Sequence, residues 1–178
     1  VSYLGSFENM AKVEAAIGLE PNAVRRLGAL AVAVPEDADR LWQRLRLANS
    51  ERERLASMGE GWGRISPLYG EKAAKALLYR LRPQQFSDRV LLGWARSQAT
   101  AHDVEWHALA TLPQRWTAPA FPLKAADFMN RGVAQGPALG AALAAAEKSW
   151  IAAGFPSDQA ALSAIAEETI RTSAATPS

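Results

Sequence analysis

Three glycines spaced four residues apart, Gly132, Gly136 and Gly140, constrain the fold of this chain more than any other feature. Pro137 follows the second glycine, and an alanine- and leucine-rich run then continues without a polar residue until Glu147. Because proline fits the first position of a helix, where its missing N–H would have no partner, we expect a helix to begin at Gly136–Pro137. The preceding glycines predict a tight turn.

Two interpretations of this turn remain open at the level of sequence. In the structural one, the glycines let two helix backbones pack closely at a corner. In the functional one, the first turn of the helix at Gly136 presents free N–H groups and the positive end of the helix dipole to a phosphate. Lys124 and Arg131 lie on the approach to the turn and are candidate phosphate ligands, as is Arg115 slightly upstream.

Helical periodicity dominates the whole sequence, and no segment shows the alternation of a strand. We therefore expect an all-α protein with no significant sheet, in which an irregular helical body precedes a smaller helical tail. Prolines between residues 113 and 122 deny helical hydrogen bonds and predict an extended connector there. The predicted body covers residues 1–115, the tail residues 116–171, and a frayed terminus residues 172–178.

Local signals predict several helix boundaries within the body. A helix is expected from Glu36 to Leu47, with Trp42 and Leu45 facing the core. Ser50 and Glu53 form a capping-box pattern for the helix that follows. Further helices are expected over residues 70–81, where Pro83 stops the helix, over 84–100, and from a cap at Asp103 to residue 112; the last helix of the tail is expected over 157–171.

The basic residues are concentrated in the middle of the chain. Residues 40–96 hold twelve lysines and arginines and five acidic residues, which leaves a local charge of +7, whereas the whole chain carries +2. Such a segment is typical either of a surface that binds a polyanion or of a solvated helix face with internal ion pairs. The body residues that we predict to contact RNA are Arg44, Arg46, Arg52 and Arg64.

No catalytic or metal-binding constellation is evident. Asp37-Ala38-Asp39 stands at a predicted helix start, where acidic side chains complement the helix dipole. His102-Asp103 lacks the further histidines of a metal-dependent phosphohydrolase, so Asp103 is interpreted as a helix cap. Trp62 lies in a glycine-rich loop near Arg64 and is either a stacking platform for a base or, as we favour, a loop anchor.

Three segments resemble the region that follows the catalytic domain in bacterial CCA-adding tRNA nucleotidyltransferases and the related poly(A) polymerases. In the tail the family motif matches at seven positions: Asp127, Phe128, Gly132, Gly136, Pro137, Gly140 and Leu143. The sequence departs from this motif at Ala125, Ala126 and Gln135. RLRLANSERERLA (residues 44–56) and VEAAIGLEPNAVRRLGALA (residues 13–31) resemble two further family elements, and the three segments keep the family's order.

The resemblance implies a non-catalytic RNA-binding portion of an enzyme that acts on tRNA or other RNA 3′ ends. Catalysis, Mg²⁺ and the nucleoside triphosphate would then belong to an N-terminal catalytic domain, the chain's expected partner besides RNA. Because the first residue is valine, we expect the sequence to be part of a longer protein. CCA addition and poly(A) addition are not distinguished, and the alternative is a helical protein-interaction module, with candidate grooves on the alanine-rich faces of residues 141–146 and 160–166.

Composition narrows the cellular setting. The absence of cysteine excludes disulfides and thiolate metal sites and suits a reducing compartment, so a cytoplasmic location is expected. No apolar run reaches the roughly 18 residues of a membrane span, and no membrane partner is expected.

Overall fold

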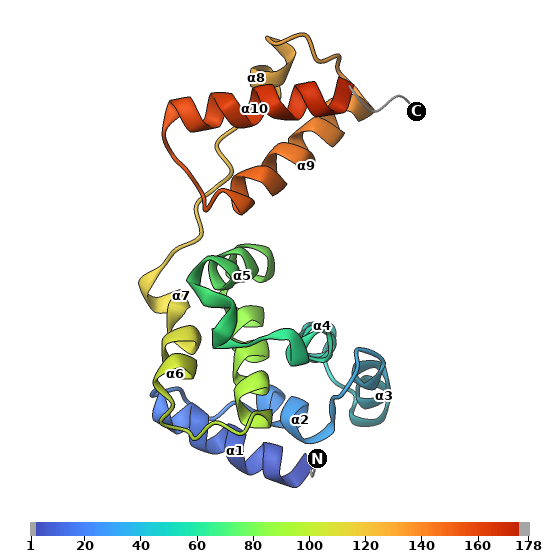
Figure 1. Ribbon diagram of the computed structural model, residues 1–178. Coiled ribbons are helices and arrows are strands. Elements are labelled where there is room, and N and C mark those ends of the chain that lie inside the picture. The colour runs from blue at the N-terminus through green and yellow to red at the C-terminus, as the bar shows by residue number, and fades with distance from the viewer. Residues whose placement is uncertain (1–2, 175–178) are drawn as a thin grey trace. The chain divides into compact units, whose positions relative to one another are not determined.

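The computed structural model describes residues 3–174 and is all-α over that range (Figure 1). Ten α-helices, two short 3-10 helices and no strand are present among these residues, which confirms the predicted fold class. The chain divides into two compact units, Val1–Ala118 (unit 1) and Pro119–Ser178 (unit 2). The division lies three residues beyond the boundary expected after residue 115, and Pro113, expected in an extended connector, lies instead in the short helix Leu112–Arg115.

Unit 1 is an irregular helical bundle. Helix α1 packs against α2 and α5, and α4 packs against α2, α3 and α5. Met10, Leu55, Phe86 and Trp94 are fully or almost fully buried in its core. Its elements are α1 (Tyr3–Ala16), α2 (Ala23–Ala31), α3 (Glu36–Leu45), α4 (Asn49–Gly59), η1 (Trp62–Arg64), η2 (Pro67–Tyr69), α5 (Gly70–Arg96), α6 (Val104–Ala110) and α7 (Leu112–Arg115).

Helix α5 contains the break that Pro83 predicts. Arg82 leaves the helical conformation at φ 65° and ψ 162°, so that two helical segments meet at a kink. The residue before a proline is disfavoured in the α conformation, because the proline ring crowds its backbone. The second segment ends at Arg96, four residues before the predicted end at Thr100, and the Ser97 N–H bonds to the Trp94 carbonyl.

Two predictions about α3 and α4 are wrong. Trp42 and Leu45 do not face the core: they are 37% and 53% exposed, because α3 packs chiefly against α4 among the described helices. Helix α4 begins at Asn49, so Ser50 is not its cap. Ala48 occupies the N-cap position instead, and its backbone N–H donates to the Glu51 carboxylate at 2.8 Å. Ser50 is the second residue of the helix.

Unit 2 is formed by three helices. Helix α9 packs against both α8 and α10, and its core includes the buried side chains of Phe128, Ala146, Trp150 and Leu162. The indole N–H of Trp150 donates to the Pro156 carbonyl at 2.8 Å. The three helices are α8 (Ala125–Met129), α9 (Pro137–Ala152) and α10 (Gln159–Ala174).

Helix α10 is longer than expected. It continues past Arg171 to Ala174, so residues 172–174 are helical rather than frayed. The Thr172 hydroxyl donates to the Glu168 carbonyl at 3.0 Å, which bonds this last part back to the preceding turn. The rest of the predicted frayed terminus, residues 175–178, lies outside the described residues.

Candidate nucleic-acid interface

The glycine turn of unit 2 does not serve close helix packing. A Cβ atom built at Gly132, Gly136 or Gly140 would meet no other atom within 4 Å. Gly132 and Gly136 have φ angles of 91° and 128°, which residues with side chains rarely adopt, so the turn itself requires them. Gly140 lies in the first part of α9, has no positive φ and has open space where a Cβ would stand. The fold therefore gives no structural reason for a glycine at this position.

The start of α9 is exposed and has an unused donor. Pro137 occupies the first helical position, as predicted, and the N–H groups of Leu139 and Gly140 both donate to the Gly136 carbonyl. The N–H of Ala138 has no acceptor among the described residues. Free N–H groups and the helix dipole favour an anion at such a position.

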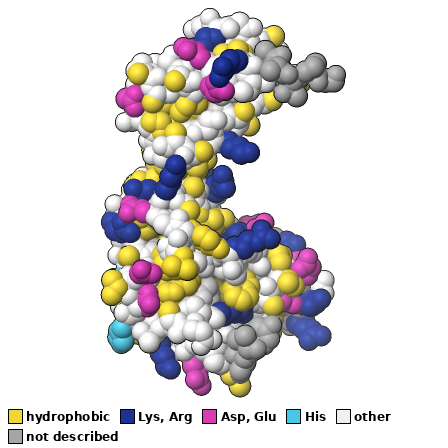
Figure 2. All heavy atoms as spheres, in the orientation of Figure 1, with side chains coloured by type: hydrophobic (Ala, Val, Ile, Leu, Met, Phe, Trp, Pro, Cys, Tyr) yellow, Lys and Arg dark blue, Asp and Glu magenta, His cyan; other side chains and the backbone are white. Residues whose placement is uncertain are grey.

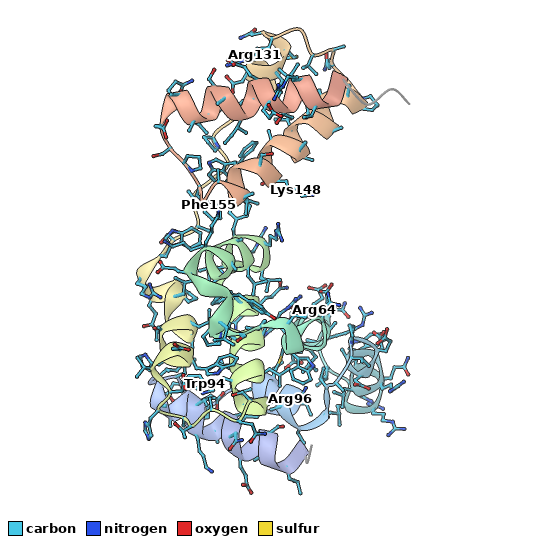
Figure 3. All side chains as sticks on the ribbon, in the orientation of Figure 1. Arg64, Trp94, Arg96, Arg131, Lys148 and Phe155 are labelled. Atoms are coloured by element: carbon cyan, nitrogen blue, oxygen red, sulfur yellow. The ribbon has the colours of Figure 1, made fainter. Side chains whose placement is uncertain are left out.

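Lys124 and Arg131 lie at the two ends of α8. Lys124 is exposed; its backbone N–H donates to the Asp127 carboxylate at 2.7 Å, and its carbonyl accepts the Asp127 N–H at 3.0 Å. The Arg131 guanidinium donates to the Asp127 carbonyl at 2.6 Å and to the Ser163 hydroxyl on α10 at 3.0 Å. In Figure 3, Arg131 lies beside α8 and α10, whereas Lys148 lies toward the far end of α9. Lys124 is therefore the less constrained cation of this turn.

The predicted body residues fall into two groups. The side chains of Arg44, Arg46 and Arg64 are exposed and form no ion pair or hydrogen bond with any described residue. Arg52 instead pairs with Asp39 at 2.5 Å and stacks on the ring of Trp42. Figure 3 shows Arg64 on the segment that joins α4 to α5.

Arg115, predicted as a further ligand, lies beside acidic groups. Its guanidinium donates to the Ala108 carbonyl at 3.0 Å and lies 3.7 Å from a Glu71 carboxylate oxygen. Glu71 also pairs with Lys75 at 2.8 Å, and these cations, with Lys75 the larger influence, lower the pKa of the Glu71 carboxyl. Arg115 and Lys75 thus share the Glu71 carboxylate, and the positive charge of Arg115 already has an acidic partner on the surface of unit 1.

A buried ionic network accounts for part of the basic charge of unit 1. The Glu14 carboxylate on α1 accepts N–H groups from Arg25 at 2.7 Å and Arg26 at 2.8 Å. The Asp88 carboxylate on α5 accepts from Arg25 at 3.2 Å and from Arg54 at 2.9 Å. Both carboxylates are almost fully buried, so these arginines join four helices rather than face a ligand.

Sequence reasoning missed this network and, within residues 40–96, three free cations. The residues it joins are far apart in sequence, and no local pattern indicates their pairing. The side chains of Lys72, Arg80 and Arg82 are exposed and, like those of Arg44, Arg46 and Arg64, make no ion pair or hydrogen bond within the described chain. Only their position in the basic segment could have indicated them.

The basic side chains of unit 1 do not form one continuous positive patch on the face that Figure 2 shows. On the face that Figure 2 shows, Lys and Arg side chains of unit 1 stand among Asp, Glu and hydrophobic side chains. The net +7 of residues 40–96 is partly neutralised by acids outside that segment: Asp37 pairs with Arg40 at 2.8 Å and Asp39 pairs with Arg52.

The other motifs have structural positions. Asp37 accepts the Ala33 and Val34 N–H groups at 2.8 and 3.1 Å, and these bonds lower the pKa of its carboxyl. Asp103 caps α6 by accepting the Trp106 N–H at 2.9 Å. Trp62 is a loop anchor: its indole donates to the Ala33 carbonyl at 3.1 Å and its ring lies under the guanidinium of Arg96.

Metal-binding and membrane-spanning features were also sought in the part of the chain that the structure describes. Residues 3–174 hold no group of three or more His, Asp or Glu side chains placed to bind a metal ion. None of the helices in this range combines the length and apolar character that a bilayer span requires.

The alanine-rich faces that could form a partner groove are partly occupied. Ala142 and Ala146 on α9 and Ala166 on α10 are buried where these two helices pack in unit 2.

No protein-family model matches the chain, and no curated protein matches it significantly.

Proposed function

We propose that this chain binds RNA through phosphate contacts, as a non-catalytic C-terminal portion of a nucleotidyltransferase that acts on tRNA or other RNA 3′ ends. The observation that carries the proposal is the start of α9 in unit 2. There an exposed helix N-terminus with a free Ala138 N–H coincides with Gly140, a helical glycine that packing does not require. Glycine allows close approach of a backbone to a ligand.

Sequence resemblance and charge add support. The three segments similar to the CCA-adding and poly(A) polymerase family keep that family's order, and one of them contains this turn. Double-stranded RNA is recognised mostly by shape and by phosphate and 2′-hydroxyl contacts, for which scattered cations and helix starts suffice. Lys124 at the turn and Arg44, Arg46 and Arg64 in unit 1 are available for such contacts.

The chemistry of the parent enzyme would belong to another domain. The resemblance implies Mg²⁺ and a nucleoside triphosphate, and residues 3–174 hold no group of three acidic or histidine side chains placed to bind a metal ion. In this proposal an N-terminal catalytic domain holds both and is the chain's protein partner in the cytoplasm.

Binding of a tRNA transcript to the 178-residue chain tests the proposal. In fluorescence anisotropy at low salt, Lys124→Glu is expected to weaken binding about three- to tenfold, because one exposed attractive charge becomes repulsive. The matched control is Lys148→Glu, which makes the same charge change on an exposed residue of α9 and is expected to change affinity less than about twofold. Absence of tRNA binding, or equal losses in both variants, would contradict the proposed tail contact.

A further inference from the structure

A pocket of about 270 Å³ opens on unit 1. It is formed by the segment that joins α4 to α5, by the first half of α5 and by Leu109 of α6. Ile65, Leu77 and Leu109 give it apolar walls. All of these groups belong to unit 1, so the pocket is complete within it.

The charge of this pocket is exclusively positive. Arg64 and Arg80 line it, and both guanidinium groups are exposed and free of ion pairs and hydrogen bonds among the described residues. No acidic side chain lines it. A neighbouring pocket of about 230 Å³ shares Ala74 and Leu109 with it but is lined by Glu71 and Glu105 as well as Arg115. The contrast shows that only the first pocket is suited to an anion.

Tyr69 gives the pocket a flat, exposed aromatic surface. Its side chain lines the pocket although the residue is 63% exposed, and no described residue bonds its hydroxyl group. The backbone beneath it is held in place, because the Ser66 hydroxyl caps η2 by accepting the Leu68 N–H at 3.3 Å. An exposed ring on a fixed turn is suited to stacking against another planar group.

We propose that this pocket binds one unpaired nucleotide of an RNA strand. The base would stack on Tyr69 against the walls formed by Ile65 and Leu77, and the phosphate would lie between Arg64 and Arg80. The pocket volume of 270 Å³ lies just below the roughly 300–1,000 Å³ of sites for drug-sized ligands, a size that suits one small planar ligand. The inference rests on the proposed function for the identity of the ligand, since the pocket's own features specify a planar group bearing an anion.

Binding of hexaadenylate, a single-stranded RNA, to the 178-residue chain tests this inference by fluorescence anisotropy. We expect Tyr69→Ala to weaken binding about tenfold and Tyr69→Phe to retain it, since stacking needs the ring and not the hydroxyl group. Arg64→Gln and Arg80→Gln are each expected to weaken binding at least about threefold. Lys12→Gln, which removes an exposed cation of α1 that has no ion pair or hydrogen bond among the described residues and does not line the pocket, is the control and should leave affinity unchanged.

The outcomes separate this inference from the proposed function. If tRNA binds and hexaadenylate does not, or if Lys12→Gln and Arg64→Gln cause equal losses, the pocket assignment is overturned while the tail contact stands. If hexaadenylate binds with the expected pattern but tRNA affinity is indifferent to Lys124→Glu, the pocket assignment stands and the tail contact fails. Displacement of hexaadenylate by hexaglutamate, but not by adenosine 5′-monophosphate, would identify an acidic peptide site instead and overturn the assignment. Far-UV circular dichroism confirms that each variant remains folded.

Discussion

At the scale of single residues, what distinguishes a functional from a structural side chain here is whether the fold already uses it. Arg54 and Arg64 belong to the same basic segment, yet Arg54 bonds to Asp88 at 2.9 Å while Arg64 has no partner among the described residues. The same contrast applies to glycines. Gly136 is required by its φ of 128°, whereas the conformation and surroundings of Gly140 would accept a side chain.

Gly140→Ala therefore separates stability from binding. Glycine in a helix is less favourable than alanine, and nothing lies within 4 Å of the added Cβ, so the free energy of unfolding should rise by about 0.5–1 kcal/mol. The affinity for tRNA should fall about three- to tenfold, because the Cβ would obstruct close approach of a phosphate to the backbone. Urea denaturation and fluorescence anisotropy measure the two effects.

The matched control for this prediction is Ala145→Gly, at an exposed position farther along α9. It should lower the free energy of unfolding by about 0.5–1 kcal/mol and leave tRNA affinity unchanged. A Gly140→Ala protein that is more stable and binds tRNA as tightly as the original would remove the main support for a phosphate site at α9.

At the scale of elements, the buried network of Glu14, Arg25, Arg54 and Asp88 fixes how α1, α2, α4 and α5 meet. Asp88 takes N–H groups from α2 and α4 on a side chain that is 1% exposed. Removing one partner of a buried pair leaves the other charge desolvated, which costs more than the pair itself contributes. The packing of these helices should therefore be sensitive to the loss of any one of these charged groups.

Asp88→Asn should lower the free energy of unfolding by about 3–5 kcal/mol, because Arg25 and Arg54 would keep their charges without this carboxylate. Asp39→Asn is the matched control: it breaks an ion pair with Arg52 in which both side chains are about half exposed, and should cost at most about 1 kcal/mol. Urea denaturation followed by circular dichroism measures both. Equal effects would show that burial of the Asp88 pair contributes nothing.

Helix α5 offers a second prediction at this scale. Arg82 adopts a φ of 65° and a ψ of 162°, a combination populated almost only by glycine, and such a residue carries about 1–3 kcal/mol of strain. Arg82→Gly should thus raise the free energy of unfolding by about 1 kcal/mol after the loss of backbone entropy is included. Arg80→Gly, two residues earlier in regular helix, should lower it by about 0.5–1 kcal/mol. A lower midpoint of urea denaturation for Arg82→Gly would contradict the strain.

Sequence predicted the elements well wherever a residue acts on its own backbone. Pro137 and Asp103 mark helix starts, and Pro83 marks the kink, because each acts within a few residues of itself. The exposure of Trp42 was not predictable, since periodicity defines an apolar face but not whether another helix covers it. Ser50 is not the cap because the helix already begins at Asn49, where the Glu51 carboxylate accepts the N–H of the N-cap residue Ala48.

At the scale of the whole molecule, the ion pairs of the fold decide which lysines and arginines remain available to a polyanion. The sequence does not show which residues form these pairs. Arg54 and Asp88 are 34 residues apart, and Arg25 and Asp88 are 63 apart. The charge of residues 40–96 predicted a basic surface, but five of its twelve cations are paired with acids. The ion pairs of the fold thus show which of these cations have acidic partners, whereas the interface itself stays a prediction.

Salt dependence of tRNA binding tests whether unpaired cations carry the interaction. Each phosphate contact contributes about 0.7–0.9 to the slope of log affinity against log salt concentration, because it releases condensed counterions. Arg46→Gln removes an exposed, unpaired cation and should make the slope shallower by about that amount. Arg40→Gln removes a cation that is already paired with Asp37, and the slope should stay the same, since a neutralised guanidinium releases few counterions from RNA. If both substitutions changed the slope equally, net charge rather than pairing would govern binding, and the choice of contact residues from the ion pairs of the fold would be wrong.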